Sequence, residues 1–335
     1  MRLALPLRLA LGLILLAAFV GTPVQAAEIR HEAVLNGVRL VYWTSRPLVP
    51  GDEPVVFLHG GPGYNSYSFR RTAGARLAAH VAMVYLDQRG SGESERPWRG
   101  DYATASLVED IEALRVALGV GRIVPMGHSY GGMVAAEYAL AHPARVAKLV
   151  LLDAAIDVPA AMAAWMGTLE SSEAGALEKA RDSDAGKTLA QVPAGDACAL
   201  ARARLAFVGV AQQHMASSQA FHDRQQFHRR DALDEQRRLD AESGVRNTGE
   251  IGASVFAPGS DFACYRTQAV ERLTMPVLVA VGAHDRAVGV APQRALAQAL
   301  PKGRLAVFEN SAHFPYAEEP AAFDARLLRF LSTGD

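Results

Sequence analysis

Residues 127–132 read Gly-His-Ser-Tyr-Gly-Gly, and the apolar stretch Arg122-Ile-Val-Pro-Met126 comes directly before them. A stretch of helical character follows at once. The sequence therefore predicts a strand that turns sharply into a helix, with Ser129 in the turn, where a strained backbone holds the hydroxyl clear of the chain. Gly127 and Gly131 fit this turn, because strand and helix come too close there for side chains. We interpret the stretch as a nucleophile elbow at the carboxyl end of a sheet.

The composition is that of a globular chain. It has 335 residues, 50% of them hydrophobic, and a formal net charge of −1. A chain of this length can bury one large core or two modest ones. A charge so close to zero gives no sign of a nucleic-acid partner.

The first 26 residues predict a signal peptide. Arg2 and Arg8 give a positive start, Leu9–Val20 is a short apolar run, and Val24-Gln25-Ala26 offers small residues to a signal peptidase. The run is short for a membrane span, although an uncleaved N-terminal anchor is the alternative. On either reading we expect the protein to be exported, to the periplasm or the medium, with no stable membrane insertion after cleavage.

Export bears on the only two cysteines, Cys198 and Cys264. In an oxidising compartment the pair can form a disulfide, and two unpaired buried thiols are the alternative. Neither cysteine is interpreted as a nucleophile.

The rest of the chain predicts a mostly parallel sheet wrapped by helices. Asn36-Gly37 lies between two strand-like runs and indicates a hairpin. Continuous apolar runs, typical of strands covered on both faces, follow at 54–58, 81–86, 123–126, 146–152, 275–281 and 303–308. Helical patterns are found at 107–118 and 321–331.

Residues 157–265 break this alternation and indicate several helices. The expected organisation is a first core part at 27–155, an inserted helical lid at 156–268, and a second core part at 269–335.

In such sheets the functional groups gather where strands end. After the strand at 54–58 comes His59-Gly-Gly-Pro-Gly63. Its glycines allow a close backbone approach, and we expect the N–H groups of Gly61 and Tyr130 to form an oxyanion hole. A plain tight turn is the alternative.

Two later exit loops complete a catalytic triad. Asp285 follows the strand at 275–281, and His313 follows the strand at 303–308. In the predicted triad, His313 takes the proton of Ser129 and Asp285 holds the histidine tautomer. Asp153, which also follows a strand, competes for the role of the acid.

Several other polar residues are expected to be structural. The side chain of His128 should point away from Ser129, and His284 should support its loop. His214, His222 and His228 lie in the lid without metal-ligand spacing. Glu318 and Glu319 should form a solvated helix start, and Asp87-Gln-Arg-Gly-Ser-Gly-Glu-Ser94 should support the site from beneath.

Together, His59–Gly63, Asp87–Gly92, the elbow, and the loops of Asp285 and His313 resemble the proline iminopeptidase family of α/β hydrolases. The resemblance implies a serine peptidase that removes an N-terminal residue, often proline, from small peptides, with no metal or organic cofactor. The elbow departs from the family, whose proline-specific members often have Gly-Gly-Ser-Trp-Gly where this chain has Gly-His-Ser-Tyr-Gly.

Such peptidases also hold the substrate ammonium with lid carboxylates. Glu250 is the candidate here, with Glu235 and Glu242 as weaker ones, and a surface charge is the alternative for each.

The expected function is therefore that of an exported aminopeptidase that works through an acyl-enzyme on a short peptide or another small molecule. Two alternatives stay open. One is a carboxylesterase or lactonase with the same triad and no ammonium anchor, and the other is a non-catalytic protein that senses a ligand in the same pocket.

Overall fold

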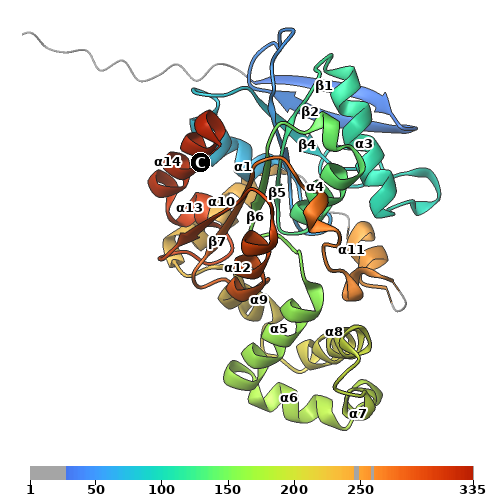
Figure 1. Ribbon diagram of the computed structural model, residues 1–335. Coiled ribbons are helices and arrows are strands. Elements are labelled where there is room, and N and C mark those ends of the chain that lie inside the picture. The colour runs from blue at the N-terminus through green and yellow to red at the C-terminus, as the bar shows by residue number, and fades with distance from the viewer. Residues whose placement is uncertain (1–27, 245–248, 258–259, 335) are drawn as a thin grey trace, which may run out of the picture.

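The computed structural model describes residues 28–244, 249–257 and 260–334 (Figure 1). The predicted signal peptide lies outside the described residues. No helix within the described ranges is both long enough and apolar enough to cross a membrane.

The core is an eight-stranded sheet in the order β1-β2-β4-β3-β5-β6-β7-β8. The first two strands form the predicted antiparallel hairpin, β2 pairs antiparallel with β4, and all other neighbours are parallel. The strands are β1 (Ile29–Leu35), β2 (Val38–Thr44), β3 (Val55–Leu58), β4 (Met83–Asp87), β5 (Val124–His128), β6 (Leu149–Leu152), β7 (Val277–Gly282) and β8 (Gly303–Phe308). The predicted fold class is confirmed.

Helices cover both faces of this sheet, which is why its strands are apolar throughout. Val56 and Leu58 of β3 face one core, whereas Val55 and Phe57 face the other. The helices of the first face are α3 (Thr104–Ala117), α4 (Tyr130–Ala141) and α12 (Val290–Ala299). Those of the second are α1 (Tyr67–Phe69), α2 (Ala75–Leu77), α13 (Pro315–Glu318) and α14 (Pro320–Thr333).

The helices of the insertion lie between β6 and β7. They are α5 (Val158–Ser172), α6 (Ala174–Arg181), α7 (Asp184–Gln191), α8 (Ala197–Gln213), α9 (Ser218–Gln226), α10 (Arg230–Ser243) and α11 (Glu250–Val255). Helices α5 to α8 extend away from the sheet, whereas α9 to α11 lie close to the core (Figure 1). We call this insertion the lid.

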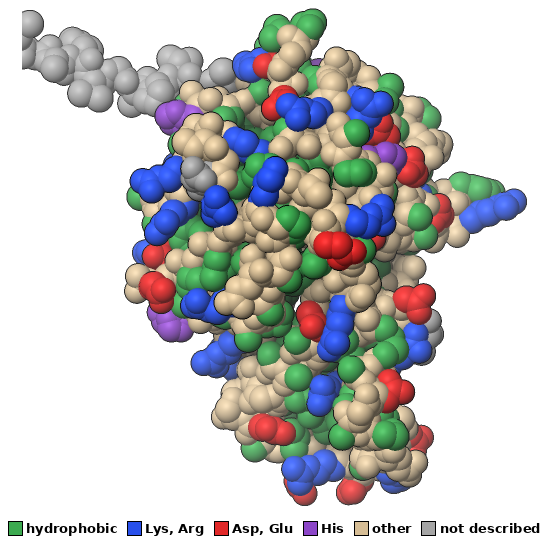
Figure 2. Space-filling model, in the orientation of Figure 1, with side chains coloured by type: hydrophobic (Ala, Val, Ile, Leu, Met, Phe, Trp, Pro, Cys, Tyr) green, Lys and Arg blue, Asp and Glu red, His purple; other side chains and the backbone are tan. Residues whose placement is uncertain are grey.

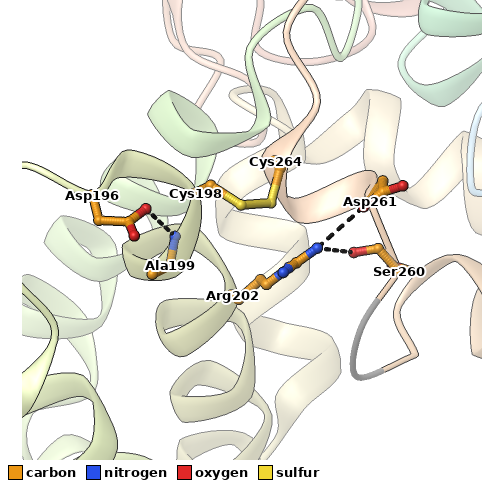
Figure 3. The surroundings of a disulfide bond; sticks show 7 residues. All are labelled: Asp196, Cys198, Ala199, Arg202, Ser260, Asp261 and Cys264. Carbon is orange, nitrogen blue, oxygen red and sulfur yellow. Dashed lines mark hydrogen bonds and ion pairs between the residues drawn. A yellow bond between two sulfur atoms is a disulfide. The ribbon is translucent and has the colours of Figure 1, made fainter.

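A disulfide links α8 to the end of the lid. It joins Cys198 to Cys264 across 66 positions of sequence, so the alternative of two free thiols is wrong (Figure 3). Near the disulfide, the Asp196 side chain caps the N-terminus of α8. Arg202 of the same helix forms an ion pair with Asp261 at 3.1 Å. The bridge and the ion pair hold the same two segments together.

Candidate active site

Ser129 lies in a strained turn between β5 and α4. Its φ is 55° and its ψ is −121°, a backbone conformation that a residue with a side chain rarely adopts. Three backbone hydrogen bonds hold it there: the Ser129 N–H donates to Leu152 O at 3.0 Å, and the N–H groups of Gly132 and Ala155 each donate to Ser129 O at 2.9 Å. The predicted turn is therefore present, fixed by the neighbouring strand β6.

The turn packs directly against the glycine loop that follows β3. A Cβ atom added at Gly131 would lie 2.3 Å from the backbone oxygen of Leu58, and one added at Gly60 would lie 2.8 Å from Cβ of Ser129. Any side chain at either position would separate the loop from the turn. The two predicted features of the sequence thus meet at one place.

The two predicted oxyanion donors border this contact. Tyr130 is the first residue of α4, so its N–H has no partner within the helix and lies at the positive end of the helix dipole. Gly61 is exposed, and its N–H donates to no acceptor in the described part of the chain. Both groups are placed where they can donate to a ligand.

His313 and Asp285 form a buried hydrogen-bonded pair. Nδ1 of His313 lies 2.9 Å from Oδ2 of Asp285, while Oδ1 of Asp285 accepts from the N–H groups of Ala287 (2.7 Å) and Val288 (3.0 Å). Burial acts to raise the pKa of Asp285, but the interaction with His313 and the other hydrogen bonds outweigh it and lower that pKa. Asp285 is therefore an anion that holds the ring through Nδ1, which leaves Nε2 for a proton transfer.

The loop that carries His313, residues 309–314 between β8 and α13, is bonded both to the elbow and to the lid. We call it the histidine loop. Nε2 of His128 donates to His313 O at 2.8 Å, and His313 N–H donates to Gln226 O, at the end of α9, at 2.9 Å. Burial, followed by the proximity of His313, lowers the pKa of His128 to about 3. His128 is thus a neutral structural residue whose ring turns toward His313, while Ser129 follows it in the chain.

In the described part of the chain, no hydrogen bond joins the Ser129 hydroxyl to the His313 ring. Such a bond is often long without substrate and tightens in the complex.

The competing acid, Asp153, does not bond to the histidine. It is fully buried with a φ of 42°, and its Oδ1 accepts from Gly282 N–H at 2.9 Å. It lies beside Asp285, since one oxygen of each carboxyl group and one nitrogen of His313 lie within 4.8 Å of one another. The geometry therefore favours Asp285 as the partner of the ring.

The loop after β4 supports the glycine loop from beneath, as predicted. Asp87 accepts from the N–H groups of Ser66 (2.8 Å) and Glu93 (2.9 Å). Gln88 N–H donates to Nε2 of His59 at 3.1 Å. These contacts make Asp87 and its neighbour structural residues.

Arg89 anchors the same loop to α3. Its guanidinium donates two hydrogen bonds of 2.6 Å to the Asp110 carboxylate, and both side chains are buried.

The expectation of a solvated helix start is wrong for Glu318. Its side chain is fully buried and accepts from the N–H groups of Ala312 (2.6 Å), His228 (2.7 Å) and Arg229 (2.6 Å). It therefore joins the histidine loop to the lid. The sequence showed a carboxylate shortly after His313. It could not show the partners of this carboxylate in the lid, because they lie about 90 positions earlier in the chain.

Glu250, the predicted ammonium anchor, begins α11 near the glycine loop. The next residue, Ile251, packs so closely on Gly63 that a Cβ added there would lie 2.5 Å from the isoleucine. The Glu250 carboxylate already has two partners, Arg96 at 3.0 Å and the Tyr102 hydroxyl at 3.0 Å. These contacts partly neutralise its charge, and its role as an ammonium anchor stays a prediction.

The weaker candidates lie on α10, where Glu235 and Glu242 both pair with Arg238. Sequence reasoning did not consider Asp240 on the same helix. Its carboxylate accepts from the hydroxyl of Tyr64, the residue that follows the glycine loop.

Two cavities are lined wholly or partly by the lid. One of about 800 Å³ lies inside the lid and is lined by residues that include Trp165, Val208 and Phe256. Trp165 also donates its indole N–H to Ala287 O at 2.8 Å, close to Asp285. A second cavity, of about 500 Å³, borders Tyr130. On the face shown in Figure 2, charged side chains of both signs are spread over the core and the lid alike.

Comparisons with known proteins agree with this fold. A proline iminopeptidase from Heyndrickxia coagulans is 27% identical over 297 residues, which cover 84% of this chain and 92% of that protein. The crystal structure of a proline iminopeptidase-related protein from Thermus thermophilus superposes with a TM-score of 0.70 at 22% identity, covering 91% of this chain and 98% of that one. A meta-cleavage product hydrolase from Pseudomonas fluorescens reaches 0.65 at 20% identity, covering 91% and 98%.

The sequence profile of the α/β hydrolase fold matches residues 53–320, which is most of the chain. The chain therefore belongs to the α/β hydrolase fold family, and within that family it is similar to proline iminopeptidases.

Proposed function

We propose that the protein is a serine hydrolase in which Ser129 is the nucleophile. His313 takes the hydroxyl proton as Ser129 attacks a carbonyl carbon, and returns it to the leaving group as the acyl-enzyme forms. Water then attacks the acyl group by the same route and releases the acid. The N–H groups of Gly61 and Tyr130 donate to the oxyanion. The observation that carries this proposal is the 2.9 Å bond between His313 and Asp285 beside the strained turn of Ser129.

The proposed substrates are small peptides with a free N-terminus, from which the enzyme releases proline or another residue. The resemblance of the motifs to proline iminopeptidases and the relative from Heyndrickxia coagulans support this choice. Glu250 is the proposed anchor of the substrate ammonium, because α11 packs on the glycine loop. A peptide ammonium would then compete with Arg96 for the carboxylate.

A carboxylesterase or lactonase is the second candidate, and the ion pair between Arg96 and Glu250 favours it. An ester substrate needs no ammonium anchor, so this acid could stay paired throughout turnover.

Parallel assays with proline p-nitroanilide and p-nitrophenyl acetate separate the candidates. The aminopeptidase proposal predicts turnover of the anilide that Ser129→Ala abolishes without loss of the fold. Ester turnover without anilide turnover would reject the peptidase in favour of the esterase. A folded protein that turns over neither would instead support the ligand-sensing alternative.

The anchor is tested by Glu250→Gln, with Glu178→Gln on the exposed surface of α6 as the matched control. Because a charge-assisted hydrogen bond contributes about 1.5–3 kcal/mol, KM for the anilide should rise roughly tenfold or more, and the ester rate should hold. An unchanged KM in Glu250→Gln, with a raised KM in Asp240→Asn, would move the anchor to α10.

We also propose that the protein is exported. The disulfide between Cys198 and Cys264 supports this, because such bonds persist in oxidising compartments. N-terminal sequencing of the protein from its native host should find a chain that begins after Ala26. A cytoplasmic protein with an intact N-terminus would contradict export.

A further inference from the structure

A second carboxyl group lies behind the histidine and its acid. Asp153 ends β6, and Asp285 follows β7, the next strand of the sheet. Both side chains are buried, and one oxygen of each lies within 4.8 Å of the other. Two carboxylates in one dry site repel each other strongly, so one of them keeps a proton.

The donors around the pair decide which of the two is ionised. Asp285 accepts three N–H donors, from the His313 ring and from the backbone of Ala287 and Val288. Asp153 accepts one, from Gly282, and its Oδ2 has no partner among the described residues that would stabilise a negative charge. A negative charge on Asp285 is therefore stabilised by more hydrogen bonds than one on Asp153, so the proton belongs on Asp153.

The other titratable groups around Asp153 add to this assignment. Burial raises the pKa of Asp153 well above its usual value, and the charges of Asp285 and Glu318 raise it further. His128 at the end of β5 is neutral, and Tyr316 on α13 has its pKa raised by burial. His313 is the remaining group at the pair, and it is bonded to Asp285.

We propose that Asp153 is a neutral carboxylic acid that donates a hydrogen bond from its hydroxyl to the Asp285 carboxylate and so positions that carboxylate for His313. The backbone holds Asp153 in place for this task, because its N–H donates to Ala280 O at 2.8 Å and its φ is 42°. The site then carries one negative charge instead of two. Asp153 acts only through Asp285, and its role in catalysis rests on the proposed hydrolase function.

Asp153→Asn is the decisive variant, because an amide keeps both an acceptor for Gly282 and a donor for Asp285. If Asp153 is neutral, kcat/KM should stay within about threefold of the wild type, and the acidic limb of its pH profile should not move. If Asp153 is instead a second carboxylate, the variant removes a negative charge next to His313. The acidic limb should then fall by about one pH unit, which would overturn the proposal.

Asp153→Ala removes the donor and should lower kcat/KM about tenfold or more, with the fold checked by thermal unfolding. Wild-type activity in a folded Asp153→Ala protein would overturn the positioning role. If this variant does not fold, Asp153→Asn still decides between the two charge states.

An infrared difference spectrum of wild type minus Asp153→Asn reads the proton without any substrate. At neutral pH it should contain the carbonyl band of a protonated carboxyl group, and a carboxylate band in its place would overturn the proposal. The spectrum does not depend on turnover, so a failure of the proposed function is distinguishable from a failure of this inference.

Discussion

At the scale of single residues, the site depends on groups that burial keeps in defined charge states. Asp285 is held as an anion by its hydrogen bonds, whereas His128 is held neutral by burial. Ser129, Asp285 and His313 could be proposed from the sequence, because each follows a predicted strand at one edge of the sheet. The contact between Asp153 and Asp285 could not, because strand order and side-chain direction decide it.

Asp285→Asn should lower kcat about 10³- to 10⁴-fold without unfolding the protein, because an amide cannot stabilise the imidazolium or hold its tautomer. Steady-state kinetics on the better of the two chromogenic substrates measures this. Asp324→Asn, which removes a distant ion pair with Arg76, is the control and should keep full activity. A nearly wild-type rate for Asp285→Asn would show that another acid serves His313.

His128 should make the protein sensitive to acid. Its pKa falls from 6.5 to about 3 on folding, so the unfolded chain binds the extra proton first. The stabilising effect of the neutral ring is therefore fully present above about pH 6.5 and is lost as pH falls toward 3, by about 1.4 kcal/mol per pH unit.

Urea unfolding of the wild type and of His128→Gln between pH 7 and pH 4 tests this. The free energy of unfolding should fall less steeply with acid in the variant. Parallel curves would mean that His128 is already able to protonate in the folded protein.

At the scale of elements, the sheet could be predicted strand by strand, because its buried strands are continuous apolar runs bounded by turns. The predicted strands at 81–86 and 146–152 begin too early. Val81 still bonds to Leu77 in the preceding helical turn, and Val146 forms only an isolated bridge to Ile123. Apolar side chains that lead into a strand have the same pattern as the strand itself.

Glu318 should be the strongest link between the lid and the core near the site. Glu318→Ala leaves the buried N–H of Ala312 without an acceptor, at about 1–3 kcal/mol, and also removes the acceptor of the partly buried N–H groups of His228 and Arg229. We expect the free energy of unfolding to fall by about 2 kcal/mol or more, and kcat to fall with it. Chemical denaturation is the measurement, with exposed Glu309→Ala as the control. An equal, small effect of both variants would contradict the proposed link.

At the scale of the whole molecule, the sheet carries the loops of the site, and α9 to α11 of the lid contact those loops or the residue that follows them. The sequence indicates where the lid is inserted, because strand signals stop near residue 156 and return near 275. It does not indicate which lid segments contact the core. Gln226 contacts His313, and Arg229 contacts Glu318. Each contact joins parts of the chain that are far apart in sequence, so no local sequence pattern predicts it.

The disulfide should stabilise this arrangement by restricting the unfolded chain. A loop of 66 residues corresponds to about 4 kcal/mol in the chain-entropy treatment, as an upper value. The double variant Cys198→Ala/Cys264→Ala should therefore unfold at a lower urea concentration than the wild type. Reductant should lower the urea midpoint of the wild type but not that of the double variant. If reductant leaves the wild-type transition unchanged, the bridge does not contribute to stability.

Covalent labelling with a fluorophosphonate, located by peptide mass spectrometry, tests the hydrolase proposal most directly. The proposal predicts one adduct per chain, on Ser129, which forms slowly or not at all in His313→Ala. An adduct on any other residue, or equal labelling rates for the wild type and His313→Ala, would contradict it.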